Sequence, residues 1–285
     1  MLIRYPLIAA LMAVAIWGVN VVAIKVGLAE IPPSLFNALR FGLLSLLLIP
    51  FACIPKSQIK PVIWIAVVMG IGHFYLLSVG MQYADSNTSV ILVMLGAPIS
   101  SVLSYVLGME RISRLQALGV AIAFSGISIP LFLNGTSDLK MGALFILISM
   151  TCWAVTNILV RRLEQVPLLA LQFWIGVISA PICFVGYQLT TPELTVFEQL
   201  SIPVITSVVY TVLGSSILAY SLWYATVNQY GINRVVSITF LQPLFTMIFA
   251  YLILGEVIST LQLIGGAITL MGIYLYYFSR RAVTP

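Results

Sequence analysis

The chain has 285 residues, of which 61% are hydrophobic and only 7% are charged, and its mean hydropathy is +1.12. A soluble domain carries about 25% charged residues, so 13 Lys and Arg with 8 Asp and Glu cannot cover the surface of a soluble protein of this size. The composition therefore excludes a soluble enzyme, a nucleic-acid-binding protein and a disordered chain. It indicates an integral membrane protein.

Ten apolar segments follow one another along the chain. A membrane-spanning helix needs about 20 mostly apolar residues, and clusters of polar residues, Pro and Gly divide the chain into pieces of this length. In chain order the expected helices are 5–28, 34–53, 61–80, 87–107, 114–133, 140–160, 167–188, 202–224, 233–254 and 260–278. We therefore predict an all-α polytopic fold with ten transmembrane helices and no soluble domain.

Basic residues predict how these helices are oriented, because cytoplasmic connections carry an excess of Lys and Arg. With the N-terminus inside, the cytoplasmic segments hold Arg4, Lys56, Lys60, Arg111, Arg114, Arg161, Arg162, Arg234, Arg280 and Arg281. The opposite connections hold Lys140, and Lys25 lies near the outer end of the first helix. Both termini are therefore expected to be cytoplasmic, and the net charge of +5 reflects topology more than an anionic partner.

A repeat divides the chain into two halves. Residues 110–127 and 256–273 are identical at ten of eighteen positions. We expect a first five-helix repeat at 1–134 and a second at 135–285, which is inverted because five helices reverse the direction of the chain. Inverted repeats are typical of transporters that bind substrate where the repeats meet. The alternative is a duplication that only stabilises a helical bundle.

The repeated residues carry a resemblance to a known family. Two copies of Glu-x-Ile-Ser-x-Leu-Gln-x-x-Gly follow Pro98 and Pro243, and a Trp-Gly-x-Asn motif begins at Trp17. With these motifs the sequence resembles the drug/metabolite transporter superfamily, specifically its ten-helix EamA-type members. The resemblance implies efflux or uptake of small metabolites, and some similar proteins export amino acids, including aromatic ones.

The signature residues of the two copies are predicted to have a structural role. They are Glu110, Ser113, Gln116, Glu256, Ser259 and Gln262. Each Ser and Gln pair has the spacing of a capping box, in which both side chains bond to backbone N–H groups at the start of a helix. Each Glu precedes the same helix, where the helix dipole favours negative charge.

Prolines and glycines inside the helices also recur in both halves. Pro98 and Pro243 are expected to kink the fourth and ninth helices, as a hinge, as part of a cavity wall or only for packing. Four glycines at heptad spacing are Gly119, Gly126, Gly265 and Gly272. Small residues allow membrane helices to approach closely, within or between subunits, which leaves a homodimer open.

Three polar side chains lie at a similar depth inside the membrane, where such groups usually face a bundle interior or water. They are Asn20, Arg40 and His73. We expect Arg40 to attract a carboxylate or phosphate and the other two to orient polar groups of a substrate. The alternatives are that Arg40 reaches outward or bonds helix-end carbonyls, and that His73 is a neutral hydrogen-bonding group between helices.

Trp17 and Trp153 lie near the centre of the first helix of each half, and Asn157 follows the second of them by one turn. The tryptophans could only pack, but they could also form flat apolar walls or contact an ammonium group. Together with the three polar residues, this set predicts a site for a small molecule that has both charges and an apolar part, such as an amino acid.

The most consistent function is a secondary transporter of small organic metabolites, most plausibly amino acids, by alternating access and as an exporter in a bacterial inner membrane. The alternatives are a sugar-phosphate or nucleotide-sugar exchanger and a receptor or assembly protein without transport. An enzyme is disfavoured because one His and no deep carboxylate pair cannot supply a catalytic centre. We expect no metal and no cofactor, and the expected partners are a small-molecule substrate and lipid.

Overall fold

The computed structural model describes residues 6–109, 112–133, 135–160, 162–190, 200–230 and 236–281, and all regular structure in them is helical. The first half contains α1 (Pro6–Leu28), α2 (Pro33–Leu48), η2 (Ile49–Phe51), η3 (Lys56–Gln58), α3 (Ile59–Val67), η4 (Val68–Tyr75), α4 (Leu76–Tyr83), α5 (Ser86–Met94), α6 (Gly96–Val106) and α7 (Arg114–Leu133). Glu110 and Arg111 lie outside the described residues.

The second half repeats this series. It contains α8 (Ser137–Val160), α9 (Leu168–Thr190), α10 (Ile202–Val209), η6 (Tyr210–Ala219), α11 (Tyr220–Tyr230), η7 (Val236–Leu241), α13 (Gln242–Phe249), η8 (Ala250–Leu254) and α14 (Thr260–Arg281). In the described residues, eight helices are long and apolar enough to cross a membrane, and the shorter apolar helices Ile238–Leu254 and Thr260–Tyr276 occupy the last two predicted segments. The chain is therefore an all-α polytopic membrane protein.

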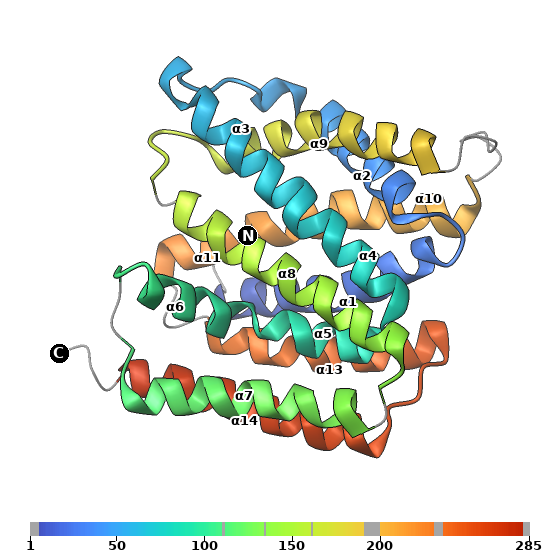
Figure 1. Cartoon of the computed structure of the whole chain (residues 1–285). Helices are drawn as coiled ribbons and strands as arrows, with labels where there is room; N and C mark the ends of the chain where they lie inside the picture. The colour runs from blue at the N-terminus through green and yellow to red at the C-terminus, as the bar shows by residue number, and fades with distance from the viewer. Residues whose placement is uncertain are drawn as a thin grey trace.

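The helices run roughly along one direction, and their connections gather at two ends of the bundle. In Figure 1 the connections after α2, α6 and α8 lie at the left end, and those after α1, α4, α7 and η8 lie at the right end. Connections that the sequence assigns to one side of the membrane thus share one end of the bundle. We call the end that contains residues 84–86 and 255–259 the hairpin end.

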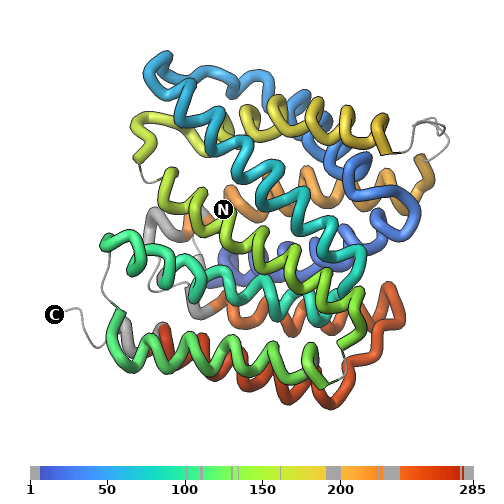
Figure 2. Tube along the Cα trace, in the orientation of Figure 1, coloured from blue at the N-terminus to red at the C-terminus, as the bar shows by residue number. Residues whose placement is uncertain are grey.

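The first helix of each half packs on the third and fourth segments of the other half. Helix α1 contacts α10, η6, α11 and α13, and we call these five elements the α1 group. Helix α8 contacts η4, α4, α5 and α6, which together form the α8 group. Figure 2 shows α8 running beside α4 although the two are far apart in the sequence. Exchange of the first helices therefore joins the halves and places their contact surface along the centre of the bundle.

Two helix pairs flank these groups. Helices α2 and α9 form one pair, and α7 and α14 form the other at the lower edge of Figure 1. A Cβ atom added to Gly119 would lie 2.7 Å from the backbone oxygen of Gly272, and one added to Gly126 would lie 2.5 Å from the backbone nitrogen of Thr269. The glycines predicted to allow close packing therefore do so within one chain.

Both halves contain interruptions of the regular α-helix at matching places. The wider π-helical turns η4 and η6 lie between α3 and α4 and between α10 and α11. Further along, the helix breaks at Leu95 just before Pro98, and a 3₁₀ segment ends just before Pro243. The proline positions predicted to be kinked thus begin new helical segments. π-Helical turns are frequent at functional sites, and η4 contains His73.

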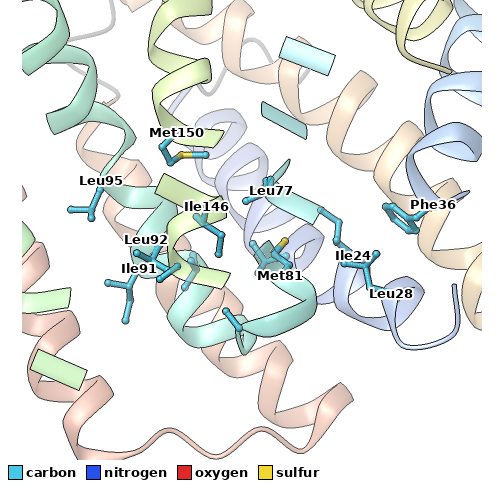
Figure 3. Close-up of a cluster of buried hydrophobic side chains, with 14 of the residues drawn as sticks. Ile24, Leu28, Phe36, Leu77, Met81, Ile91, Leu92, Leu95, Ile146 and Met150 are labelled. Atoms are coloured by element: carbon cyan, nitrogen blue, oxygen red, sulfur yellow. The ribbon is translucent and has the colours of Figure 1, made fainter. Parts of the chain in front are cut away.

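The hydrophobic core at the hairpin end is formed by α1, α2, α4, α5 and α8. Figure 3 shows Ile24 and Leu28 of α1 beside Met81 of α4, with Leu92 of α5 and Ile146 of α8 near them. All five side chains are less than 9% exposed. This core fills the space between the α1 group and the α8 group near the hairpin end.

Candidate substrate site

Arg40 lies near the middle of α2, and only 2% of its surface is exposed. Its Nη2 donates a hydrogen bond to the Oγ of Ser216 in η6 over 3.2 Å. Its Cζ lies 4.1 Å from the ring centroid of Phe74 in η4 and 5.6 Å from that of Phe41. Arg40 therefore bridges the α1 group and the α8 group, and among the described residues it bonds no helix-end carbonyl.

His73 is held by a reciprocal pair of hydrogen bonds to α8. The hydroxyl of Ser149 donates to the backbone oxygen of His73 over 3.0 Å, and Nδ1 of the imidazole lies 2.9 Å from the same hydroxyl oxygen. Because that hydroxyl has one proton, we infer that Nδ1 carries a proton and donates it. Nε2 of a neutral ring is then an acceptor, and within the described part of the chain it makes no hydrogen bond.

The imidazole also connects His73 to Arg40. Its ring centroid lies 4.6 Å from that of Phe74, whose ring is in turn covered by the guanidinium of Arg40. Arg40 and His73 are close enough to interact electrostatically. The structure thus places two of the predicted polar residues next to each other through an aromatic side chain that the sequence did not single out.

Trp17 lies in an aromatic cluster on the α1 group. Its ring centroid lies 5.1 Å from that of Tyr220 and 5.4 Å from that of Trp223. Tyr220 interacts electrostatically with Arg40, which connects the cluster to the guanidinium. Asn20 lies one turn further along α1. Ser216, Tyr220 and Trp223 were not predicted from the sequence. All three belong to the third helical segment of the second half, and His73 belongs to the third helical segment of the first half.

Trp153 belongs to the α8 group and packs against the apolar cluster that contains Phe41 and Phe74. Its Cε3 would lie 3.3 Å from a Cβ atom added to Gly96, so this glycine provides room for the indole. Asn157 is half-buried on the same helix. No described contact joins Asn157 to Arg40 or His73, so its place in the site rests on its position on α8.

Several buried polar atoms of this region have no hydrogen-bond partner among the described residues. They are Nε1 of Trp17, Oδ1 of Asn20, Nε of Arg40, Oγ1 of Thr156 and Oγ1 of Thr211. Leaving a buried polar group unsatisfied costs about 1–3 kcal/mol. Three of these atoms belong to residues predicted from the sequence, and Asn20 and Thr156 occupy equivalent positions in the two halves. These atoms are hydrogen-bonding groups that a polar ligand could satisfy.

The Ser and Gln of both signature motifs form helix caps. The backbone N–H of Ser113 donates to Oε1 of Gln116 over 2.8 Å, and the N–H of Gln116 donates to Oγ of Ser113 over 3.2 Å. Ser259 and Gln262 make the same two bonds over 2.9 and 3.2 Å. Both motifs therefore start the last helix of their half.

Two apolar cavities lie beside α2 and contain none of the predicted site residues. The first, of about 280 Å³, is lined by Leu35, Ala38, Leu39, Ala180, Pro181 and Phe184. The second, of about 180 Å³, is lined by Leu39, Leu43, Leu200, Val204, Ile205, Val208 and Val209. Hydrocarbon side chains form both linings, so these cavities do not offer a site for a charged substrate.

His73→Ala and Trp153→Ala are each expected to raise the KM of transport by about fivefold, because they remove a hydrogen-bonding ring and an aromatic wall. Trp64→Ala is the matched control, since the side chain of Trp64 is 67% exposed and lies outside the proposed site. Counterflow kinetics at equal protein content would measure the effect. Unchanged kinetics in both site variants would remove these residues from the site.

Comparisons with known proteins agree with this architecture. The profile of the EamA-like transporter family matches residues 4–132 and again 140–278. A protein of Salmonella typhimurium named "Probable amino-acid metabolite efflux pump" is 27% identical over 286 residues, which cover 95% of this chain and 94% of the relative. Its namesake in Escherichia coli is 25% identical over 283 residues, covering 95% of this chain and 94% of the relative.

Two further similarities extend this result. "Uncharacterized transporter YoaV" of Bacillus subtilis is 26% identical over 284 residues, covering 94% of this chain and 96% of the relative. A crystal structure described only as that of a protein superposes with a TM-score of 0.67 over 99% of both chains, at 16% sequence identity. At that identity the superposition supports the fold alone.

Proposed function

Because this chain belongs to the EamA-like transporter family, we propose that it is a secondary transporter that exports small organic metabolites, most plausibly amino acids, by alternating access. The proposal extends to its setting, a bacterial inner membrane in which two inverted repeats place both termini in the cytoplasm. Relatives named as amino-acid metabolite efflux pumps support the substrate class without fixing it. The family is a transporter family and not an enzyme family.

One observation carries the substrate class: a buried arginine lies between the two helix groups, and buried polar atoms without a described partner lie on the first helix of each group. Arg40 presents a permanent positive charge that suits a carboxylate. The faces of Trp17 and Tyr220 suit an ammonium group or an apolar side chain. Oδ1 of Asn20 and Oγ1 of Thr156 offer acceptors for the same ammonium group. A zwitterion with an apolar part would satisfy all of these groups at once.

A sugar phosphate or nucleotide sugar fits the site less well. Arg40 is the only Lys or Arg that is buried among the described residues, whereas a phosphate group carries up to two negative charges and is typically held by several donors. A receptor or assembly protein without transport would bind a ligand at the same site but would not move it. A measurement of transport flux therefore distinguishes a transporter from a receptor or assembly protein.

Counterflow in proteoliposomes tests the proposal. Vesicles preloaded with one unlabelled compound would be assayed for uptake of its labelled form, over a panel of amino acids, their decarboxylated amines, sugars and phosphorylated sugars. We expect accumulation for one or more amino acids and none for phosphorylated sugars. Accumulation of phosphorylated sugars alone would overturn the substrate class, and ligand binding without any accumulation would overturn transport.

A further inference from the structure

A polar cluster at the hairpin end joins the connection between α4 and α5 to α1 and to the start of α14. The connection between α4 and α5 exposes the last carbonyl groups of one helix and the first N–H groups of the next, which have no partners within their own helices. Nζ of Lys25 in α1 donates to the backbone oxygens of Met81 and Ala84, each over 2.8 Å. A positive charge at this position also complements the negative end of the α4 dipole.

The start of α5 receives a negative charge from the second half. Glu256, in the connection between η8 and α14, accepts hydrogen bonds from the backbone N–H of Ser86 over 2.9 Å and from its hydroxyl over 2.9 Å. Nδ2 of Asn87 lies 3.5 Å from the same carboxylate. Lys25 interacts electrostatically with both Glu256 and Asp85. The signature carboxylate therefore caps a helix of the other half.

Gln262 adds a second connection from the other half. Its Oε1 closes the capping box of α14, while its Nε2 donates to Oδ1 of Asp85 and to Oγ1 of Thr88, each over 3.0 Å. Asp85 is itself the N-cap of α5, since Oδ1 accepts from the backbone N–H of Thr88 over 2.8 Å. The connection between α4 and α5 is thus held from α1 on one side and from the start of α14 on the other.

Helices α4 and α5 form a hairpin that can separate from α1 and from the start of α14 only if it moves together with α8. Close packing of Gly80 against Gly142, where an added Cβ would lie 2.7 Å from the opposing backbone oxygen, joins α4 tightly to α8. The contacts of this hairpin with α1 are less extensive, and Ile24 and Leu28 of α1 belong to the same apolar cluster as Met81 (Figure 3). We therefore place the path from the hairpin end to the proposed site between α1 and the hairpin, where the packing is less extensive.

We propose that Lys25, Glu256 and Gln262 form a latch that closes the hairpin end of the transport path and releases when the α8 group moves away from α1 and from the start of α14. The latch deepens the transport function proposed above and rests on it. Its bonds satisfy helix termini at the end of the bundle, where water can replace them once they separate. Such bonds hold the closed state and yet allow it to open reversibly.

The test uses Gln262→Glu, which retains the oxygen that closes the capping box but places a carboxylate against Asp85. A reporter cysteine is introduced by Asn20→Cys in a full-length background with Cys53, Cys152 and Cys183 changed to Ser. The rate of its labelling by a membrane-impermeant maleimide is measured in sealed vesicles of both orientations, without substrate. A separate Thr136→Cys variant identifies the membrane side that the hairpin end faces, because Thr136 is exposed at that end.

From that side, Gln262→Glu is expected to raise the labelling rate by about tenfold, the effect of losing hydrogen bonds to a charged group. Adding Asp85→Asn should return the rate to near the parental value, because it removes the negative charge that faces the new carboxylate. Asp138→Asn, which removes an exposed carboxylate at the same end, should leave it unchanged. Folding of each variant is checked by its thermal unfolding.

An unchanged labelling rate in folded Gln262→Glu would overturn the latch, and so would a raised rate that Asp85→Asn does not reverse. The measurement needs no substrate, so its failure is distinct from failure of the transport assay. If Gln262→Glu raises labelling and Asp85→Asn reverses the increase, but the protein transports no compound, the latch is retained and the proposed transport function is overturned.

Discussion

Arg40→Gln is expected to lower Vmax/KM for amino-acid counterflow by roughly 10- to 100-fold. A hydrogen bond to a charged group contributes about 1.5–3 kcal/mol, and each 1.4 kcal/mol corresponds to about tenfold. Arg40 stands between Ala-Leu and Phe in the second helix of the first half, as Gln172 does in the second helix of the second half, so the substitution introduces the residue of the equivalent position. Counterflow of an amino acid and of its decarboxylated amine, measured side by side, would show whether the loss follows the carboxylate.

The amine should lose much less than the amino acid, because it has no group for the guanidinium to bind. Arg114→Gln is the control, since Arg114 is an exposed cation at the start of α7, outside the site, and we expect wild-type kinetics from it. Equal losses for the acid and the amine would contradict direct recognition of a carboxylate and would assign Arg40 to the packing of the two helix groups.

Gly272→Val is expected to destabilise the fold by about 1–3 kcal/mol or more. A Cβ atom at this position would lie 2.4 Å from the backbone nitrogen of Ala123 and 2.6 Å from the backbone oxygen of Gly119. These are backbone atoms of the facing helix, so they cannot rotate away. The helices α7 and α14 must separate, and thermal unfolding in detergent would report the loss.

Gly186→Val provides the matched control for that measurement. Gly186 also lies within a long membrane helix, α9, but an added Cβ would meet no atom within 4 Å. Both variants carry the same cost for a β-branched side chain in a helix, so the difference between them isolates helix contact. Similar unfolding temperatures for the two variants would contradict the close approach of α7 and α14.

Much of the fold could be predicted from the sequence because a membrane imposes simple requirements. Ten apolar segments of about 20 residues can only be helices, and the described helices begin and end within a few residues of those expected. The capping spacing at Ser113 and Ser259 correctly indicated where the last helix of each half begins, since a capping box is a local interaction that depends on neighbouring residues alone.

The arrangement of the site could be predicted only in part. Depth along a helix placed Arg40 and His73 at one level, and the structure joins them through Phe74. Depth does not fix rotation about the helix axis, so the contact between Arg40 and Ser216 could not be foreseen. Alignment of the two halves could have indicated Ser216, because it lies in η6, the segment of the second half that corresponds to η4 with His73.

The helix that Glu256 caps could not be predicted from the sequence. The position of Glu256 before α14 suggested that it would act on the dipole of that helix, but its carboxylate caps α5 in the other half. The sequence correctly indicated a structural carboxylate at a helix start. It could not show which helix, because the partner is separated by 170 residues and is brought near only by exchange of helices between the halves.

Substrate is proposed to bind between the α1 group and the α8 group, and cysteine protection tests this binding position most directly. Asn20→Cys and Thr156→Cys, each in the cysteine-free background, place one thiol on either side of the proposed site at equivalent positions of the two halves. A saturating amino acid identified by counterflow is predicted to slow modification of both thiols several-fold. Unchanged modification at both positions, in variants that still transport that amino acid, would contradict the site.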